Sequence, residues 1–342
     1  MKEIIFFILF VMLVGCSAKP WEKAAHKYEQ SASLMNTTVT IDVCAQASQE
    51  QNLDAAFKEA WDRLADIGWR MNVFDEKSDV AKVNNSFGCP VAIGQDTYAV
   101  IKMAMEYNRL TDGAFDITVW PLISLWKSGE KTNTLPSHVE IMRTKKFLGP
   151  AVVQFLPDHQ LTLVNEVVKI DLGGIAAGYA VDETVDILRR HGFTDFLIDL
   201  GGDMYAGGHN CQGKLWKIGI KDPRDITKIF DVVFLSNAAV TTSGDYEKFY
   251  EIKGQRWSHI FNPLTGYPQK GVTSATVIAP TTIAADALAT ALCVLGRERG
   301  QRLIDHLGEG YAALIIDSPD GKAITPRVSA AYHSFKEDSK DQ

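Results

Sequence analysis

The chain has 342 residues, of which 46% are hydrophobic and 23% are charged, and its formal net charge is -7. This composition is typical of a globular protein with one large domain or two. The acidic balance, without a Lys/Arg cluster interleaved with aromatic residues, excludes a nucleic-acid-binding protein.

The N-terminus has the pattern of an export signal. Lys2 precedes an apolar run at 4–14, which is too short to span a bilayer as a mature helix and matches the hydrophobic region of a signal peptide. Gly15-Cys16 is similar to a lipobox, which predicts lipid on the Cys16 sulfur; an ordinary signal peptide is the alternative, and it would also export the chain. We therefore expect a lipid-anchored bacterial protein facing the periplasm. Its expected parts are a signal peptide at 1–15, a lipidated tether at 16–31, a folded domain at 32–334 and a charged tail at 335–342.

The other four cysteines are Cys44, Cys89, Cys211 and Cys293. They are widely spaced and form no C-x-x-C pair, so they indicate neither a zinc site nor a thioredoxin-like site. Export permits disulfides, but four cysteines allow three pairings and the sequence does not choose among them. Cys293 lies in an apolar helical segment and is predicted to be buried.

The first half of the chain is expected to become structured near Met35. Hydrophobic periodicity distinguishes its helices from its strands, and Ser137 with Glu140 forms a capping-box pattern. The predicted elements are, in chain order, a strand at 37–43, a helix at 53–71, a loop at 74–78, a helix at 96–110, a polar-aromatic turn at 113–118 and a short helix from Ser137 to about Phe147.

A glycine pair interrupts the next predicted elements. A strand at 167–172 runs into Gly173-Gly174 and a helix at 175–190. Glycines let backbone amides approach an anion, and a helix N-terminus favours negative charge, so this arrangement suits a phosphate; a simple strand-to-helix turn is the alternative. Neither the Rossmann nor the P-loop glycine pattern is present. Strands at 196–200 and 216–220, predicted as antiparallel neighbours, and at 230–235 follow.

The segment Val240–Pro268 concentrates chemically active side chains. Thr241–Gly244 reads as a small polar turn, and strands at 246–250 and 257–261 are predicted to form a hairpin around Lys253-Gly254. This hairpin would place Asp245 and His259 on neighbouring strands, where an imidazole and a carboxylate can share proton handling. A histidine with only a structural role is the alternative.

A helix predicted from about Thr282 carries a second polar pair. Asp286 and Thr290 are four residues apart, so they lie on one face, among alanines that leave room for an ion. Oxygen ligands of this kind suit Mg²⁺. The alternative is that Asp286 only complements the positive helix N-terminus.

Several segments, taken in order, resemble the ApbE family of FAD:protein FMN transferases over about residues 35–316. Each segment alone is a weak signal, whereas the ordered set is specific. The segments are Met35-Asn36-Thr37-Thr38, Gly113-Ala114-Phe115-Asp116, Asp171-Leu172-Gly173-Gly174-Ile175-Ala176-Ala177-Gly178-Tyr179-Ala180, Gly201-Gly202-Asp203, Thr242-Ser243-Gly244-Asp245-Tyr246, Ser258-His259-Ile260-Phe261-Asn262-Pro263-Leu264-Thr265-Gly266 and Ala285-Asp286-Ala287-Leu288-Ala289-Thr290.

The resemblance implies a fold and an activity. The expected fold is α+β, a single ApbE-like domain with a mixed, mainly antiparallel sheet and packed helices. The implied activity is Mg²⁺-dependent transfer of FMN from FAD, through a phosphoester bond, to a threonine or serine hydroxyl of an exported acceptor protein, with release of AMP. Such acceptors are flavoprotein subunits of membrane redox complexes. A Mg²⁺-dependent FAD pyrophosphatase and a non-catalytic FAD-binding lipoprotein remain alternatives. A serine hydrolase using Ser243 and His259 would need a G-x-S-x-G elbow, which is absent.

The resemblance also implies roles for individual residues. His259 matches the catalytic histidine, to which we assign the proton of the acceptor hydroxyl. The implied Mg²⁺ ligands are Asp286, Thr290 and the backbone carbonyl of Gly174. The implied FAD-binding positions are Met35, Phe74, Ala114, Phe115, Asp116, Asp171, Ala177, Ser258 and Ile260. The chain departs from the family at Asn36, Ala177 and Asn262, where glycine, lysine and aspartate are usual.

Overall fold

The computed structural model of the chain describes residues 25–245, 249–318 and 324–336. The predicted signal peptide, Cys16, Tyr246 and most of the predicted tail lie outside these residues. No helix in the described part of the chain is both long enough and apolar enough to cross a membrane.

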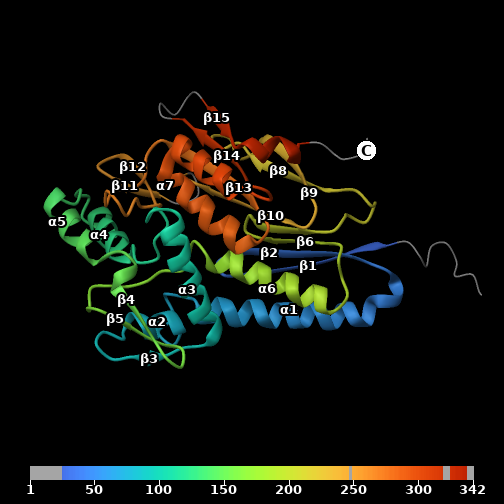
Figure 1. Cartoon of the computed structure of the whole chain (residues 1–342), viewed down its shortest axis with the longest axis horizontal. Coiled ribbons are helices and arrows are strands. Elements are labelled where there is room, and N and C mark those ends of the chain that lie inside the picture. Colours follow the sequence, from blue (N-terminus) through green and yellow to red (C-terminus); the bar gives the residue numbers. More distant parts are fainter. Residues whose placement is uncertain (1–24, 246–248, 319–323, 337–342) are drawn as a thin grey trace, which may run out of the picture.

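An eight-stranded sheet forms the centre of the molecule (Figure 1). All the strand pairings described within it are antiparallel, which confirms the predicted fold class. Its strands, in spatial order, are β1 (His26–Leu34), β2 (Thr37–Ala45), β6 (Phe196–Leu200), β7 (Asp203–Gly207), β10 (Ala238–Gly244), β13 (Val272–Ala279), β14 (Ala312–Asp317) and β15 (Thr325–Val328).

Helices cover one face of this sheet (Figure 1). They are α1 (Glu50–Arg70), α6 (Ala176–Arg190) and α7 (Thr282–Leu307), while α3 (Gln95–Leu110) packs against α1 and α7. The apolar stripe of α1, with Leu53, Leu64 and Ile67, is buried together with Ile41 and Val277 of the sheet in the main core. The helices predicted at 53–71, 96–110 and 175–190 are therefore confirmed to within a few residues, because their periodic apolar faces are buried in the main core.

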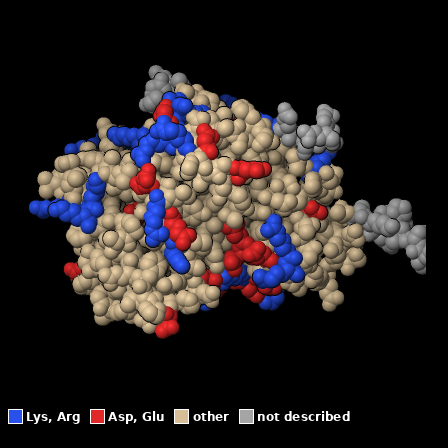
Figure 2. Space-filling model, viewed as in Figure 1, with Lys and Arg blue, Asp and Glu red and all other residues tan. Residues whose placement is uncertain are grey.

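The outer surface of these helices carries ion pairs. The guanidinium of Arg63 on α1 lies 2.7 Å from Asp96 of α3 and 2.7 Å from Glu183 of α6. Figure 2 shows acidic and basic side chains mixed over this part of the surface. Partly buried networks of this kind link neighbouring helices more firmly than isolated surface pairs do.

A two-stranded sheet covers the opposite face of the central sheet. Its strands are β8 (Trp216–Lys221) and β9 (Ile229–Leu235), which pair with each other. The pairing predicted between 216–220 and 196–200 is therefore wrong. Gly201 and Gly202, at φ 65° and 105°, reverse the chain directly after β6, so β7 becomes its partner instead.

The remaining elements form a smaller region at one end of the molecule (Figure 1). There α4 and α5 pack on a hairpin around Trp126, Ile141 and Tyr250. These elements are α2 (Asp79–Asn84), β3 (Val91–Ala92), α4 (Trp120–Lys131), α5 (His138–Thr144), β4 (Val153–Leu156), β5 (Gln160–Leu163), β11 (Phe249–Ile252) and β12 (Gln255–Ser258).

Two local predictions in this region are confirmed. Ser137 and Glu140 form the predicted capping box at the start of α5. β11 and β12 form a hairpin whose turn residues, Lys253 and Gly254, have φ of 54° and 71°, as a two-residue primed turn requires. Residues 246–248 of the first predicted strand lie outside the described residues, and β12 ends at Ser258, so His259 follows β12 rather than lying in it.

Three other predictions need correction. β1 begins at His26, so residues 26–31 of the predicted tether are part of the sheet, and the predicted tail begins in a 3₁₀-helix (Ala330–Phe335). Thr241–Gly244 lies in β10, not in a turn, and pairs with β13.

The segment 167–172 is not a strand, although its side chains alternate between buried and more exposed. The side chain of Asn84 takes the place of a partner strand. Its Oδ1 accepts a hydrogen bond from the N–H of Ile170 at 2.7 Å, and its Nδ2 donates to the carbonyl of the same residue at 3.0 Å. Asp171 N then donates to Ile117 O at 2.8 Å.

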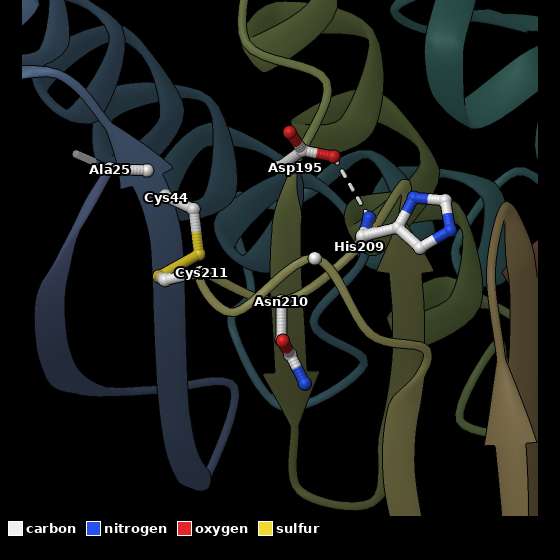
Figure 3. Close-up of a pocket in the computed structure, with 7 residues that line it drawn as sticks. Ala25, Cys44, Asp195, His209, Asn210 and Cys211 are labelled. Atoms are coloured by element: carbon white, nitrogen blue, oxygen red, sulfur yellow. Dashed lines mark hydrogen bonds between the residues drawn. A yellow bond between two sulfur atoms is a disulfide. The ribbon is translucent and has the colours of Figure 1, made fainter. Parts of the chain in front are cut away.

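Of the three possible cysteine pairings, the structure contains Cys44–Cys211. Cys89 is exposed and Cys293 is buried, as predicted for the latter. A cavity of about 340 Å³ opens beside the disulfide, where His209 N donates to Asp195 Oδ1 at 2.8 Å (Figure 3). None of the predicted site residues lines this cavity.

Candidate functional site

Gly174 lies at the centre of the candidate site, just before α6. A Cβ atom placed on Gly174 would lie 3.2 Å from Thr290 Oγ1 and 3.4 Å from the ring of Phe115. The backbone at position 174 is therefore in close contact with the third turn of α7 and with the polar-aromatic turn at 113–118. The structure thus brings together Gly174 and Thr290, two of the three predicted metal ligands.

Asp286, the third predicted ligand, is held by the first turn of α6. Gly178 N donates a hydrogen bond to Asp286 Oδ2 at 3.1 Å, and only 4% of Asp286 is exposed. A Cβ atom on Gly178 would lie 2.6 Å from the carbonyl oxygen of Thr282. Only glycine therefore allows α6 and α7 to approach closely enough for this hydrogen bond.

Ser243 joins this group from the central sheet. Its hydroxyl lies 3.3 Å from Thr290 Oγ1, and its carbonyl accepts from the Cys293 thiol at 3.5 Å. Sequence reasoning did not assign Ser243 to the metal group. The Thr-Ser-Gly motif could have indicated a role for Ser243. We interpreted this motif as a turn, whereas it lies in β10.

The oxygen atoms gathered here fit a hard divalent cation. The set comprises a carboxylate, hydroxyls and a backbone carbonyl, which Mg²⁺ prefers to sulfur or imidazole and supplements with water and substrate phosphates. Within the described ranges, no three His, Cys, Asp or Glu side chains gather in a way that would hold a metal. An ion at this site would thus depend on Asp286 for protein charge and on hydroxyl and carbonyl oxygens for the rest.

The turn at 113–118 closes one side of the group. Phe115 is buried, and its backbone is fixed by Thr111 Oγ1, which accepts from its N–H at 3.0 Å, and by Asn108 Nδ2, which donates to its carbonyl at 2.8 Å. Ala114 is buried beside it.

Asp116 and Asp171 stiffen the two turns that face α7. Asp116 Oδ1 accepts from the N–H and the hydroxyl of Thr118 at 2.8 and 2.6 Å, while burial raises the pKa of this carboxyl above its ordinary value. Asp171 Oδ1 accepts from Gly173 N at 3.0 Å. These bonds shape the two turns that meet at Gly174.

His259 begins a well-ordered loop. Ser258 Oγ accepts from Ile260 N at 3.1 Å, and the carbonyl of Ile260 accepts from Gln269 N at 2.8 Å. Asn262 Oδ1 accepts from Leu264 N at 2.9 Å, so asparagine performs the turn-forming role at this position.

The loop after His259 lies beside the turn at 113–118. A Cβ atom on Gly113 would be 3.5 Å from the side chain of Leu264. The sequence predicts that Asp245 and His259 lie on neighbouring strands of the hairpin. In the structure, however, Asp245 does not lie on a hairpin strand. It follows β10, where its N–H donates to Thr273 O, and its carboxylate pairs with Arg224 at 3.2 Å.

Met35 lies in the turn between β1 and β2, with its side chain against Gly68 of α1. Met35 and Asn36 have φ of 50° and 62°. Asparagine tolerates this left-handed conformation better than most residues, so Asn36 is compatible with a position where glycine is usual.

Phe74 is 69% exposed and belongs to an aromatic group that the sequence did not predict. Its ring lies 5.8 Å from that of Trp120, and Lys127 Nζ lies 5.6 Å and 5.3 Å from the two rings. The described contacts of Met35 and Phe74 are thus with α1 and α4, and not with the Gly174 group. The position of Trp120 just after the turn at 113–118 was the signal in the sequence.

Ala177 occupies the first turn of α6 between Gly174 and Gly178 and is half-buried. Its methyl group packs at the edge of the main core. The chain therefore has an apolar side chain at a position so close to the candidate ligands that a lysine there would bring a positive charge to the site.

Comparison with known proteins identifies the family. The ApbE family matches residues 35–315. The FAD:protein FMN transferase of Vibrio cholerae is 30% identical over 319 residues, which cover 91% of this chain and 92% of that protein. The crystal structure of the ApbE protein of Thermotoga maritima is 34% identical, with a TM-score of 0.81, over 91% of this chain and 100% of that one. The flavin transferase ApbE from Vibrio cholerae has a TM-score of 0.79 at 28% identity, over 91% and 99% of the two chains.

These matches confirm the resemblance drawn from the ordered motifs and the enzyme class expected from it. The match extends over most of the described residues and includes every predicted metal and FAD position from Met35 to Thr290. The chain belongs to the ApbE family.

Proposed function

We propose that this chain is a Mg²⁺-dependent FAD:protein FMN transferase. It would attach FMN, through its phosphate, to a threonine or serine hydroxyl of an exported acceptor protein and release AMP. The observation that carries the proposal is the approach of Gly174, just before α6, to the face of α7 that carries Asp286 and Thr290, where the candidate ligands are all oxygen atoms. The names of the similar proteins support the flavin transfer itself.

The chemistry assigns distinct tasks to the residues. Mg²⁺, when bound, would neutralise charge on the phosphate under attack. Asp286 and Thr290 would hold it together with the carbonyl of Gly174. The acceptor oxygen attacks the FMN phosphorus, the bond from that phosphorus to the bridging oxygen of the pyrophosphate breaks, and AMP leaves with the electron pair. His259 takes the proton of the acceptor hydroxyl, directly or through water.

FAD would lie along the turns that surround these residues. The exposed ring of Phe74, next to Trp120, offers an aromatic surface on which a flavin or adenine ring can stack. The other positions proposed to contact FAD are Met35, Ala114, Phe115, Asp116, Asp171, Ala177, Ser258 and Ile260.

The proposed membrane anchor would keep the folded domain close to the membrane. Nine residues lie between Cys16 and His26, where β1 begins, so the two positions are ten residue steps apart. A fully extended chain spans at most about 3.5 Å per residue, so the domain would stay within roughly 35 Å of the lipid. We therefore propose that the acceptor is a flavoprotein subunit of a membrane redox complex on the periplasmic side.

Product analysis tests this proposal. The chain is incubated with FAD, Mg²⁺ and an acceptor protein that carries an exposed threonine, and the products are separated by chromatography. The transferase predicts AMP together with covalently bound FMN in equal amounts. Free FMN and AMP in place of the adduct would identify a pyrophosphatase, which needs the same site. FAD that stays bound and intact would identify a flavin carrier.

A further inference from the structure

The helices α6 and α7 run antiparallel with a regular contact register. Gly174 lies next to Thr290, Gly178 N binds Asp286, and one turn further along α6 the side chain of Asp182 reaches Thr282. Each step of four residues forward from Gly174 therefore matches a step of four residues backward along α7. Because residues four apart share a helix face, the three contacts form one continuous seam.

Asp182 forms the outer end of this seam. Its Oδ1 accepts from Thr282 N at 2.7 Å and its Oδ2 accepts from Ile283 N at 2.9 Å. These two N–H groups belong to the first turn of α7, where backbone N–H groups have no hydrogen-bond acceptor within their own helix. Thr281, the residue that precedes α7, makes no side-chain capping bond. A carboxylate from a neighbouring helix thus performs the capping that the chain of α7 does not supply.

This cap fixes more than the helix end. The carboxylate binds two successive N–H groups, so it restricts both the shift of α7 along its axis and its rotation. Gly178 allows the close approach, since a Cβ there would lie 2.7 Å from Ile283 Cα. Asp286 and Thr290 follow Thr282 by one and two turns on the same face, so their distance from Gly174 depends on where the first turn is held.

We propose that Asp182 is a positioning residue of the metal site, which holds α7 so that Asp286 and Thr290 stand against Gly174. This inference rests on the proposed Mg²⁺-dependent function. Metal sites tolerate displacements of only about 0.5 Å, and loss of groups that orient the ligands typically weakens metal affinity about 10- to 100-fold. Asp182 would act through α7 and would touch neither the metal nor the substrate.

Direct metal binding tests the proposal. Full-length protein in detergent is titrated with Mn²⁺, and free Mn²⁺ is counted by electron paramagnetic resonance. Asp182→Asn keeps one good acceptor oxygen and should raise the Kd for Mn²⁺ about tenfold. Asp182→Ala keeps no acceptor and should raise it further. Transfer by Asp182→Asn should recover at high Mg²⁺, while its affinity for FAD without metal stays within about twofold of the wild type.

Asp186→Asn is the matched control. Asp186 is exposed one turn further along α6, and this substitution makes the same chemical change at a side chain for which no hydrogen bond to α7 is described. Its Mn²⁺ affinity should equal that of the wild type. A folded Asp182→Asn or Asp182→Ala variant that binds Mn²⁺ as tightly as the wild type would overturn the proposal and leave Asp182 a stabilising cap only.

The same titration distinguishes a failure of this proposal from a failure of the proposed function on which it rests. If the wild type binds no Mn²⁺ and its transfer survives EDTA, the metal assignment itself is wrong, and the positioning role falls with it. If the wild type binds Mn²⁺ and Asp286→Asn does not, the metal site stands, and the Asp182 variants alone decide the positioning role.

Discussion

Two opposing effects act on the carboxylate of Asp182. Burial and the nearby Asp186 raise its pKa, whereas the hydrogen bonds from Ile283 N and Thr282 N lower it; burial is the largest effect and the pKa rises to about 6. In the unfolded chain the same group titrates near 4. The folded protein therefore binds this proton more tightly, and the stability that the proton contributes is present below pH 4 and is lost as the pH rises through 6.

The pH dependence of Asp182→Asn checks this. The variant does not titrate at position 182, so the stability advantage of the wild type over the variant should shrink by on the order of 2 kcal/mol between pH 4 and pH 7. Denaturant unfolding at both pH values measures the difference. A difference that stays constant across this range would show that the carboxyl has an ordinary pKa.

His259→Ala should affect chemistry more than binding. If the imidazole accepts the proton of the acceptor hydroxyl, its loss should lower kcat by about 10²- to 10⁴-fold while the affinity for FAD changes little. Single-turnover transfer and FAD titration measure the two quantities. An unchanged rate with much weaker FAD binding would assign His259 to binding instead.

Some residues of the site could be predicted from the sequence, and others could not. Asp286 and Thr290 were found because their spacing of four residues follows from helix geometry alone. Ser243, Asp182 and Trp120 were missed because their importance comes from contacts between segments far apart in the chain, such as Asp182 with Thr282. Spacing along one helix is visible in a sequence, whereas the register between two helices is not.

At the scale of elements, the close contact of α6 and α7 depends on Gly178. Gly178→Ala gains helix propensity worth about 1 kcal/mol, but its new methyl group would meet rigid backbone at Thr282. Overpacking against atoms that cannot move aside costs about 1–3 kcal/mol. We therefore expect a net loss of stability together with weaker metal binding.

Unfolding and Mn²⁺ titration of Gly178→Ala test this expectation. A variant that is more stable than the wild type and binds Mn²⁺ normally would mean that the two helices can separate without cost, contrary to the role given to their seam.

The helices and strands that were predicted correctly are mainly those that are buried on only one face. The long helices were predicted because only one side of each is apolar. β13 was not predicted because all eight of its residues are buried, so no alternation marks it as a strand. The segment 167–172 was wrongly predicted to be a strand. Its side chains do alternate in burial, but the side chain of Asn84 takes the place of a neighbouring strand in its hydrogen bonds.

At the scale of the whole molecule, the disulfide and the site lie apart. Cys44 is near the end of β2, whereas Met35 lies in the turn just before this strand. The bond links residues 167 positions apart, and closure of so long a loop stabilises a protein by about 3–5 kcal/mol in the chain-entropy view.

The double variant Cys44→Ser/Cys211→Ser should therefore unfold at lower denaturant concentration but keep its transfer rate at 25 °C. Cys89→Ser, which changes an exposed free thiol, is the control and should alter neither property. A double variant as stable as the wild type would show that the disulfide makes no net contribution, and a large loss of rate would show that the two ends of the molecule are coupled.

The central claim is that the oxygen group of Gly174, Asp286 and Thr290 supports Mg²⁺-dependent transfer of FMN to a protein hydroxyl. The most direct measurement is the intact mass of an acceptor protein after incubation with FAD, Mg²⁺ and either the wild type or Asp286→Asn. We expect one FMN on the acceptor with the wild type, none when EDTA replaces Mg²⁺, and none with the folded variant. An FMN adduct that forms at the wild-type rate with Asp286→Asn, or in the presence of EDTA, would contradict the account.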